Sequence, residues 1–319
     1  MLAYIVRRVL FSLLVLFFLS VAVFYIVALA GNPLAELRQN PQITGADLDR
    51  IAAIYGLDQP LYVQYGIWMR DMIFYGDFGI SFRQRTEVTS IIADRIWPTV
   101  MLIGSSLILG LALGIPLGIY SAIKQYSTLD KTVTFLSFVG FSTPVFLLGL
   151  ILQLVFAIYL ADLLGYRIFP VSGMDTGSTL ELLRSLALPV TALAVTSVAV
   201  YSRFQRSAML DVLAADYLRT ARAKGLSRKV VYLKHALRNA LIPIVTIVAL
   251  ELVTLLAGAI VVETVFSWPG MGFLLIQSLN QGDYNVARAI IMIIGVLTVL
   301  FNLLADLLYS VVDPRVSYN

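Results

Sequence analysis

Six stretches of this sequence are apolar over about 20 residues, the length that an α-helix needs to cross the hydrocarbon core of a bilayer. The stretches run over residues 9–30, 98–123, 132–160, 186–201, 241–262 and 286–312. Backbone N–H and C=O groups find no water partner in lipid, so such spans must be helical. Charged residues make up only 13% of the chain, whereas about 25% is usual for soluble domains. The sequence therefore predicts an all-α integral membrane protein with six transmembrane helices.

The first apolar stretch follows Arg7 and Arg8 and ends in Ala28-Leu29-Ala30, which resembles a signal-peptidase site. Its apolar run of about 22 residues is longer than the roughly 7–15 apolar residues of a signal peptide. We therefore expect a retained membrane anchor, with cleavage after Ala30 as the alternative.

The distribution of Lys and Arg predicts the orientation, because positively charged loops stay on the cytoplasmic side of a membrane. Nine of the 23 Lys and Arg residues lie in loop 203–238. On the opposite side, loop 161–184 carries two and loop 264–286 carries none, while the long loop 31–96 is net acidic. We expect both termini and loop 203–238 in the cytoplasm of a multi-pass cell-membrane protein.

The basic loop has a helical pattern of its own. Apolar side chains recur there at helical spacing, at Leu210, Leu213, Ala214, Tyr217, Leu218 and Ala221. Gly225 fits a left-handed helix end, and Ser227 can cap a second helix that begins at Arg228. The pattern predicts a helix, a tight turn and a helix, which either lies on anionic lipid or docks into a groove of a soluble partner.

The stretch DYLRTARAKGLS, followed by HALRNALIP, resembles the cytoplasmic loop of ABC importer permeases. Those permeases carry Glu-Ala-Ala, three residues and a Gly, followed by Leu-Pro. Gly225 and Ala221 match the glycine and the second alanine of that pattern. Arg219 and Thr220 replace the glutamate and the first alanine, and the Leu-Ile-Pro before residue 244 lies farther away than in the short form. The motif is therefore degenerate.

Flanking motifs extend the resemblance to the dipeptide and oligopeptide branch of these permeases over essentially the whole chain. They are GDFG at 76–79, STPVF at 142–146, VETVFSWPGMG at 262–272 and DPR at 313–315. The resemblance implies a permease subunit that forms half of the pathway of an ATP-driven importer of peptides. The partners that it implies are a second homologous permease subunit, two ABC ATPase subunits and an extracytoplasmic substrate-binding protein.

The resemblance also implies an organisation along the chain. Residues 1–30 form the tail and first helix, 31–97 an outer loop with short helices, and 98–319 a five-helix core with a coupling loop at 203–240. The first helix of that loop is the expected coupling helix, which inserts into a cleft of the ATPase. Its expected residues are Leu213, Asp216, Tyr217, Leu218, Arg219, Thr220, Ala221, Arg222 and Gly225. Tyr217 and Leu218 are expected to anchor it in the partner, with Arg219, Arg222 and Lys224 pairing with acidic residues around them.

No phosphate-binding G-x-x-x-x-G-K-[ST] sequence occurs, so ATP and Mg²⁺ are expected to be used by partner subunits, and the chain is expected to have no enzyme activity. Cysteine is absent and His235 is the single histidine, which leaves no cofactor or metal site to predict. Nucleic acid is not an expected partner, because membrane topology explains the basic clusters.

Polar side chains within the spans are candidates for the translocation pathway, because they are costly in lipid and usually face a cavity or a partner. Glu251 lies halfway along the fifth span, and Glu263 lies at its outer end. The third span adds Ser142, Thr143 and Gln153. The alternative for Glu251 is a hydrogen bond to another span. Glu263 is alternatively a solvated residue or one that anchors a loop.

Two further patterns concern helix geometry. Pro144 removes a helix hydrogen bond and should kink the third span. Gly110, Gly114 and Gly118 recur every four residues in the second span, where they should permit close helix packing.

The long loop before the second span should contain two helices. Thr44 can cap one that runs through Tyr55 and ends at Gly56, and Asp58 with Pro60 can open the other. The second helix carries an apolar stripe of Leu61, Tyr65, Trp68, Met69 and Met72. Either these helices lie on the outer surface of the bundle, or they form a dock for the binding protein, which Trp268-Pro269-Gly270 could join.

Two other functions and several other cargoes stay open. A stand-alone secondary transporter or channel would need no coupling helix, and a membrane scaffold would not need the outer loop. Within the importer family, nickel chelates, glutathione or oligosaccharides are alternative cargoes.

Overall fold

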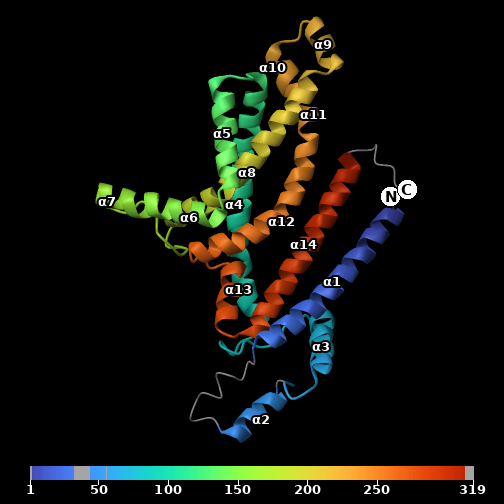
Figure 1. Cartoon of the computed structure of the whole chain (residues 1–319), viewed down its shortest axis with the longest axis vertical. Helices are drawn as coiled ribbons and strands as arrows, with labels where there is room; N and C mark the ends of the chain where they lie inside the picture. The colour runs from blue at the N-terminus through green and yellow to red at the C-terminus, as the bar shows by residue number, and fades with distance from the viewer. Residues whose placement is uncertain (1, 32–43, 55, 313–319) are drawn as a thin grey trace. The chain divides into compact units, whose positions relative to one another are not determined.

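The computed structural model describes residues 2–31, 44–54 and 56–312, and every regular element within them is a helix (Figure 1). In addition, Ile80 and Glu87 form an isolated antiparallel β-bridge. The expected DPR motif at 313–315 lies outside the described residues.

Within the residues that the structure describes, six helices are long and apolar enough to cross a membrane, which confirms the predicted number. They cover Val6–Leu29, Val88–Ile123, Val145–Leu164, Thr179–Leu213, Ile242–Val265 and Tyr284–Leu307. Two of them differ from the sequence-based bounds in a way that matters for function.

The third predicted span, 132–160, is not one helix. Helix α5 (Thr128–Ser142) ends where Thr143 is extended, with φ −87° and ψ 125°, and α6 (Val145–Leu152) begins after Pro144. Proline lacks an N–H and pushes the residue before it out of the helical region, so a break replaces the expected kink. The π-helical segment η3 (Gln153–Tyr159) and α7 (Leu160–Leu164) continue α6, and this group turns away from α5 in Figure 1.

The fourth span is longer than the predicted 186–201. Helix α8 (Thr179–Leu213) has 35 residues and is capped by Ser178, whose hydroxyl accepts a hydrogen bond from the Glu181 N–H at 3.2 Å. It continues past the apolar stretch into the polar sequence around Arg203, where hydropathy gave no sign of helix. Helix α8 packs against α5, α6 and α12 (Ile242–Val265), so it is the central helix of its unit.

The chain forms two compact units, and the larger one comprises Thr99–Pro269 with Leu300–Asn319. Within it, the glycines of α4 (Val88–Ile123) lie directly on α8, as their spacing predicted. A Cβ atom on Gly110 would lie 2.7 Å from the Ser197 Cβ, and one on Gly114 would lie 2.7 Å from the Tyr201 Cβ. Both distances are too short for any residue but glycine.

The apolar core of this unit lies among α4, α8 and α12 and includes Trp268, which is fully buried. The expectation that Trp268 joins an exposed docking surface is therefore wrong. Its indole packs inside the unit, so it has no surface left for a partner.

The smaller unit comprises Met1–Pro98 with Gly270–Val299. It contains α1 (Leu2–Ala30), α2 (Gly45–Ile54), α3 (Leu61–Arg70), the π-helical η2 (Asp71–Tyr75), the beginning of α4, α13 (Met271–Asn280) and the first half of α14 (Tyr284–Val312). The two helices predicted before the second span are thus present. Gly56 follows α2 with φ +65°, while Pro60 precedes α3.

Two residues of the predicted stripe, Trp68 of α3 and Met72 of η2, pack inward in this unit, while Leu61 is exposed. Trp68 and Met72 lie against the cluster of Val23, Val27 and Met292 from α1 and α14. Asp283, just before α14, accepts hydrogen bonds from the Ser81 hydroxyl and, at 3.2 Å, from the Phe82 N–H.

Candidate functional site

A helical hairpin follows α8, but it begins later than the periodicity predicted. The helix ends at Leu213, and Ala215 is extended, with φ −71° and ψ 141°, before α9 (Asp216–Ala223). The returning arm consists of α10 (Arg228–Val230), π-helical η4 (Val231–Ala236) and α11 (Leu237–Ala240).

The turn of the hairpin depends on one glycine. Gly225 has φ +77°, and a Cβ there would meet no atom within 4 Å, so backbone conformation alone explains the residue. This confirms the predicted left-handed turn. Ser227 occupies the predicted capping position but makes no side-chain capping hydrogen bond.

One face of α9 belongs to the protein's own interior. Leu218 is fully buried and Ala221 nearly so. They pack with Ala122, Met209, Val231, Ala236 and Ala240, and Leu213 lies half-buried against the same cluster. Leu218 therefore has no surface to offer a partner, and its expected role as an anchor is wrong; it holds the hairpin together instead.

The other face of α9 is exposed and polar. The Asp216 and Arg219 side chains are 93% and 76% exposed. Arg219 Nη1 lies 3.4 Å from Asp216 Oδ1, which makes a weak surface ion pair. Tyr217 is 43% exposed, and its hydroxyl accepts a hydrogen bond from the Asn239 side-chain amide at 2.7 Å. The Arg222 guanidinium lies 6.0 Å from the Tyr232 ring centre. Helix α9 thus presents charge and one aromatic ring on a rigid base.

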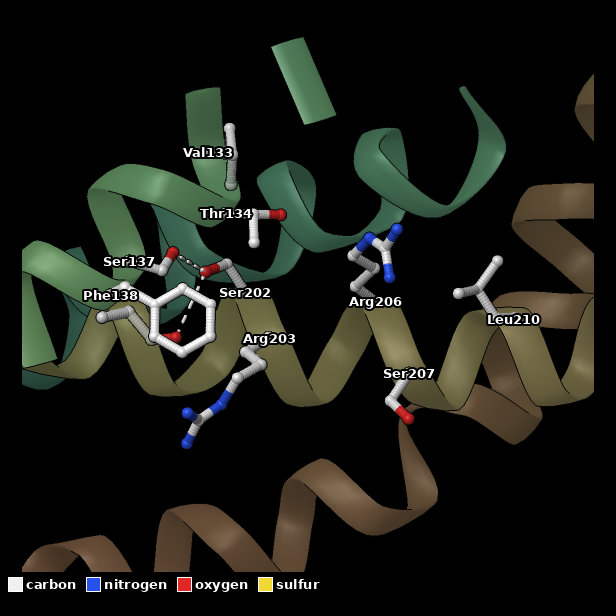
Figure 2. Close-up of a pocket in the computed structure, with 10 residues that line it drawn as sticks. Val133, Thr134, Ser137, Phe138, Ser202, Arg203, Arg206, Ser207 and Leu210 are labelled. Carbon is white, nitrogen blue, oxygen red and sulfur yellow. Dashed lines mark hydrogen bonds between the residues drawn. The ribbon is translucent and has the colours of Figure 1, made fainter. Parts of the chain in front are cut away.

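A cavity of about 280 Å³ lies between α5 and α8 (Figure 2). Its walls combine hydroxyl, cationic and apolar groups from Val133, Thr134, Ser137, Phe138, Ala199, Ser202, Arg203, Arg206, Ser207 and Leu210. Figure 2 shows the Ser137 and Ser202 hydroxyls facing each other, at 3.0 Å. The Arg203 guanidinium lies 5.1 Å from the Phe141 ring centre.

One ion pair joins the two helices beside this cavity. Arg206 donates from Nε and Nη2 to the two carboxylate oxygens of the buried Asp130, at 2.7 and 2.9 Å. The Tyr126 N–H adds a third hydrogen bond, at 2.9 Å. The bonds from Arg206, together with the one from Tyr126, hold the pKa of Asp130 below its usual range. Asp130 thus links the α4–α5 turn to α8.

We expect Asp130→Asn to destabilise the protein by about 2 kcal/mol at pH 7, the value for a hydrogen bond to a charged group. Because the native pKa of Asp130 is lowered, the pair contributes its full stability above the unfolded pKa of about 4. That contribution is lost as the pH falls through the native pKa. Melting temperatures measured against pH should therefore converge for wild type and Asp130→Asn in acid.

Asp216→Asn, at an exposed pair, is the control and should match wild type. A difference in melting temperature between wild type and Asp130→Asn that is constant at all pH values would contradict the assignment.

Glu251 lies buried between α12 and α8, within reach of the Tyr201 and Ser197 hydroxyls. Within the described part of the chain, its Oε2 and both hydroxyls have no hydrogen bond of normal geometry. The same holds for Gln205, one turn farther along α8, and for Ser121 of α4. Glu251 therefore sits in a buried polar seam and is not among the residues that line the cavity of Figure 2.

The other predicted pathway residues fall into two groups: Gln153 and Glu263 make hydrogen bonds inside the protein, and Ser142 and Thr143 lie at the break between α5 and α6. Gln153 donates to the Val171 and Val265 carbonyls, at 2.8 and 3.1 Å. Glu263 is fully buried and accepts a hydrogen bond from Thr99 at 2.6 Å.

The Thr143 hydroxyl donates to the Val139 carbonyl at 2.7 Å, so it closes the last turn of α5. Ser142 beside it is exposed at the break. Of the predicted residues in the third span, Ser142 is thus the one whose side chain is turned outward.

Two family models match the chain. One, described as binding-protein-dependent transport system inner membrane component, matches residues 114–318. The other, described as the N-terminal part of a binding-protein-dependent transport system membrane component, matches residues 1–103.

Curated relatives match over the full length. The oligopeptide transport system permease protein AppB of Bacillus subtilis is 43% identical, with both chains covered completely. The dipeptide permease DppB of Alkalihalophilus pseudofirmus is 39% identical, and the glutathione permease GsiC of Escherichia coli K12 is 38% identical, each also with complete coverage.

Solved structures show the same fold at low sequence identity. An inward-facing structure of the methionine ABC transporter MetNI aligns with a TM-score of 0.57 and 17% identity, covering 70% of this chain and 97% of the other. An amino acid ABC transporter solved with histidines aligns with a TM-score of 0.51 and 18% identity, covering 69% and 94%.

Proposed function

The chain belongs to the family of binding-protein-dependent transport system inner membrane components, and we propose that it forms half of the translocation pathway of an ATP-driven peptide importer. Two of the relatives named above are permeases for oligopeptides and for dipeptides, which supports peptides as the cargo class. Glutathione, itself a short peptide, is the second candidate, because GsiC is as long and nearly as similar.

The observation that carries the proposal is the α9 hairpin. Its inner face, with Leu218 and Ala221, is buried against other apolar residues of the same chain. Its outer face, with Asp216, Tyr217, Arg219, Thr220 and Arg222, is exposed around a left-handed turn at Gly225. An isolated helix of eight residues would be unstable in water, so a core dedicated to holding it rigid suggests that the exposed face serves docking.

We assign the docking partner of α9 as a cytoplasmic ABC ATPase, which would use the ATP and Mg²⁺. The remaining partners are a second permease subunit, a second ATPase and an extracytoplasmic substrate-binding protein. Closure of the ATPases would pull on α9, and through it on α8, because the hairpin packs on the Met209 region of that helix.

Within the membrane, we assign the pathway to the surface around the α5–α6 break, where Ser142 is exposed. Gln153, Glu263 and Thr143 would support that surface through their structural hydrogen bonds. Glu251 would reach the pathway only when α8 and α12 move apart.

The test is reconstitution of the chain in liposomes with its partner permease, ATPases and binding protein. We expect uptake of labelled di- and oligopeptides that requires ATP, and ATP hydrolysis that rises when loaded binding protein is added. Glutathione in parallel distinguishes the cargo classes. Transport by the purified chain alone, with no ATPase present, would overturn the proposal in favour of a secondary transporter or channel.

A further inference from the structure

The smaller unit holds a cation at an unusual place. Arg288 lies in the second turn of α14, inside the stretch Tyr284–Leu307 that is apolar enough to span a membrane. Its guanidinium carbon lies 5.1 Å from the ring centre of Phe24 and 5.8 Å from that of Trp68. A charged residue within a span is costly and usually pairs with another charge or with backbone carbonyls.

Arg288 has no partner of opposite charge among the described residues. Its hydrogen bonds reach the Tyr284 carbonyl, at 3.4 Å, and the Asn285 side-chain oxygen, both on its own helix. The nearest acid along the chain, Asp283, is occupied by Ser81 and Phe82. The aromatic faces compensate part of the cost of the charge, but neither they nor the two neutral oxygens supply a negative charge.

A cavity of about 200 Å³ adjoins the guanidinium. It is lined by Val27, Ala28, Gly31, Leu57, Leu61, Gln64, Tyr284 and Arg288. Gly31 leaves room for the Tyr284 hydroxyl, which a Cβ atom at residue 31 would overlap. The Gln64 amide nitrogen donates to the Gln59 carbonyl at 2.8 Å, so it is already occupied. The cavity therefore combines the cationic Arg288 and the polar Tyr284 and Gln64 with apolar residues of α1 and α3.

We propose that this cavity binds a membrane phospholipid, with the headgroup phosphate on Arg288 and the start of an acyl chain along Val27 and Leu61. A guanidinium presents paired donors that match the geometry of phosphate oxygens. The site lies where α1 ends and α14 begins, at the ends of two membrane spans.

The depth of the site fits a lipid headgroup. The rings of Phe24 and Trp68 lie against the Arg288 guanidinium, and the centres of neighbouring rings among Phe24, Tyr25, Tyr65 and Trp68 lie 5.5 to 6.4 Å apart. Tyr and Trp concentrate at the headgroup level of membranes. The volume is below the roughly 300–1,000 Å³ of sites that enclose a whole small molecule, so it suits a phosphate whose chains remain in the bilayer.

The test is lipid retention by the full chain. Wild type and Arg288→Gln are purified in mild detergent, and bound lipid phosphorus is measured after washing and after reloading with phosphatidylglycerol. We expect at least about tenfold weaker retention in Arg288→Gln, the effect of losing a charged hydrogen-bonding partner. Arg70→Gln removes the same charge from the exposed end of α3, where Arg70 pairs with Asp71 at 2.7 Å, and should retain lipid as wild type does.

Two further arms identify the ligand. Diacylglycerol with the same acyl chains should not raise the melting temperature of delipidated protein, whereas phosphatidylglycerol should. Arg288→Lys keeps the charge but loses the paired donors, so it should fold and retain lipid at an intermediate level, which covers the case in which Arg288→Gln does not fold. Equal lipid retention in all variants, or an equal melting shift with inorganic phosphate or a short peptide, would overturn the proposal.

Discussion

Gly118→Ala is expected to destabilise the protein by about 2–3 kcal/mol, the cost of overpacking a tight interface. A Cβ atom on Gly118 would lie 2.5 Å from the Ser202 carbonyl oxygen and 2.7 Å from the Gln205 Cβ. Both groups are fixed to the backbone of α8, so neither can rotate away, and the two helices must separate. Since α8 also carries the hairpin at its end, transport should fall together with stability.

The matched control is Gly104→Ala on the same helix. A Cβ atom there meets no atom within 4 Å. Alanine in a helix interior is favoured over glycine by about 1 kcal/mol, so this variant should be as stable as wild type or more so. Melting of the two purified variants in the same detergent should differ by roughly 5 °C. Equal melting temperatures would mean that α4 and α8 do not touch at Gly118 in the folded protein.

The glycine spacing illustrates what sequence alone predicts well. The number of spans, the close packing at Gly110 and Gly114 and the left-handed turn at Gly225 all follow from local patterns: apolar length, a four-residue repeat and a single permissive residue. Each of these features needs information from only one segment of the chain. They are also the features that the structure confirms without change.

The predictions that failed share a different cause: the contact that determines the role of the residue comes from a distant part of the chain. Amphipathic periodicity placed Leu218 on one face of α9, but only the packing of Met209 and Val231 against it shows that this face is internal. The pair of Asp130 and Arg206 was missed because 76 residues separate its members. The one local sign was the capping of α5, where the Asp130 N–H donates to the Ser127 hydroxyl at 3.2 Å.

Hydropathy misjudged helix ends for a related reason. A hydropathy profile measures lipid solubility, and α8 stays helical beyond the lipid-soluble part because α5 and the hairpin pack against it. Conversely, 132–160 carries no charged residue, yet Pro144 divides it, because backbone geometry and not apolar character sets where a helix stops. Both discrepancies fall on the elements that connect the hairpin to the proposed pathway.

Adjacent residues of α9 should have separable effects if the hairpin docks on an ATPase. Tyr217→Glu puts a charge on the exposed face and should lower ATPase co-purification at least tenfold, the loss typical of an aromatic residue central to an interface. Tyr217→Phe loses only the hydrogen bond from Asn239 and should keep most of the association. Leu218→Ala instead empties the buried cluster, at a cost of about 3 kcal/mol, and should loosen the hairpin itself.

Trypsin distinguishes the two effects, because Arg219, Arg222 and Lys224 offer cleavage sites on the exposed hairpin. Tyr217→Glu should give the wild-type cleavage rate with the ATPase lost, whereas Leu218→Ala should be cut faster. If Tyr217→Glu retains the ATPase and its stimulation by loaded binding protein, the exposed face of α9 is not the docking surface. Faster cleavage of Tyr217→Glu itself would instead mean that Tyr217 belongs to the internal packing, and the separation of the two faces would be wrong.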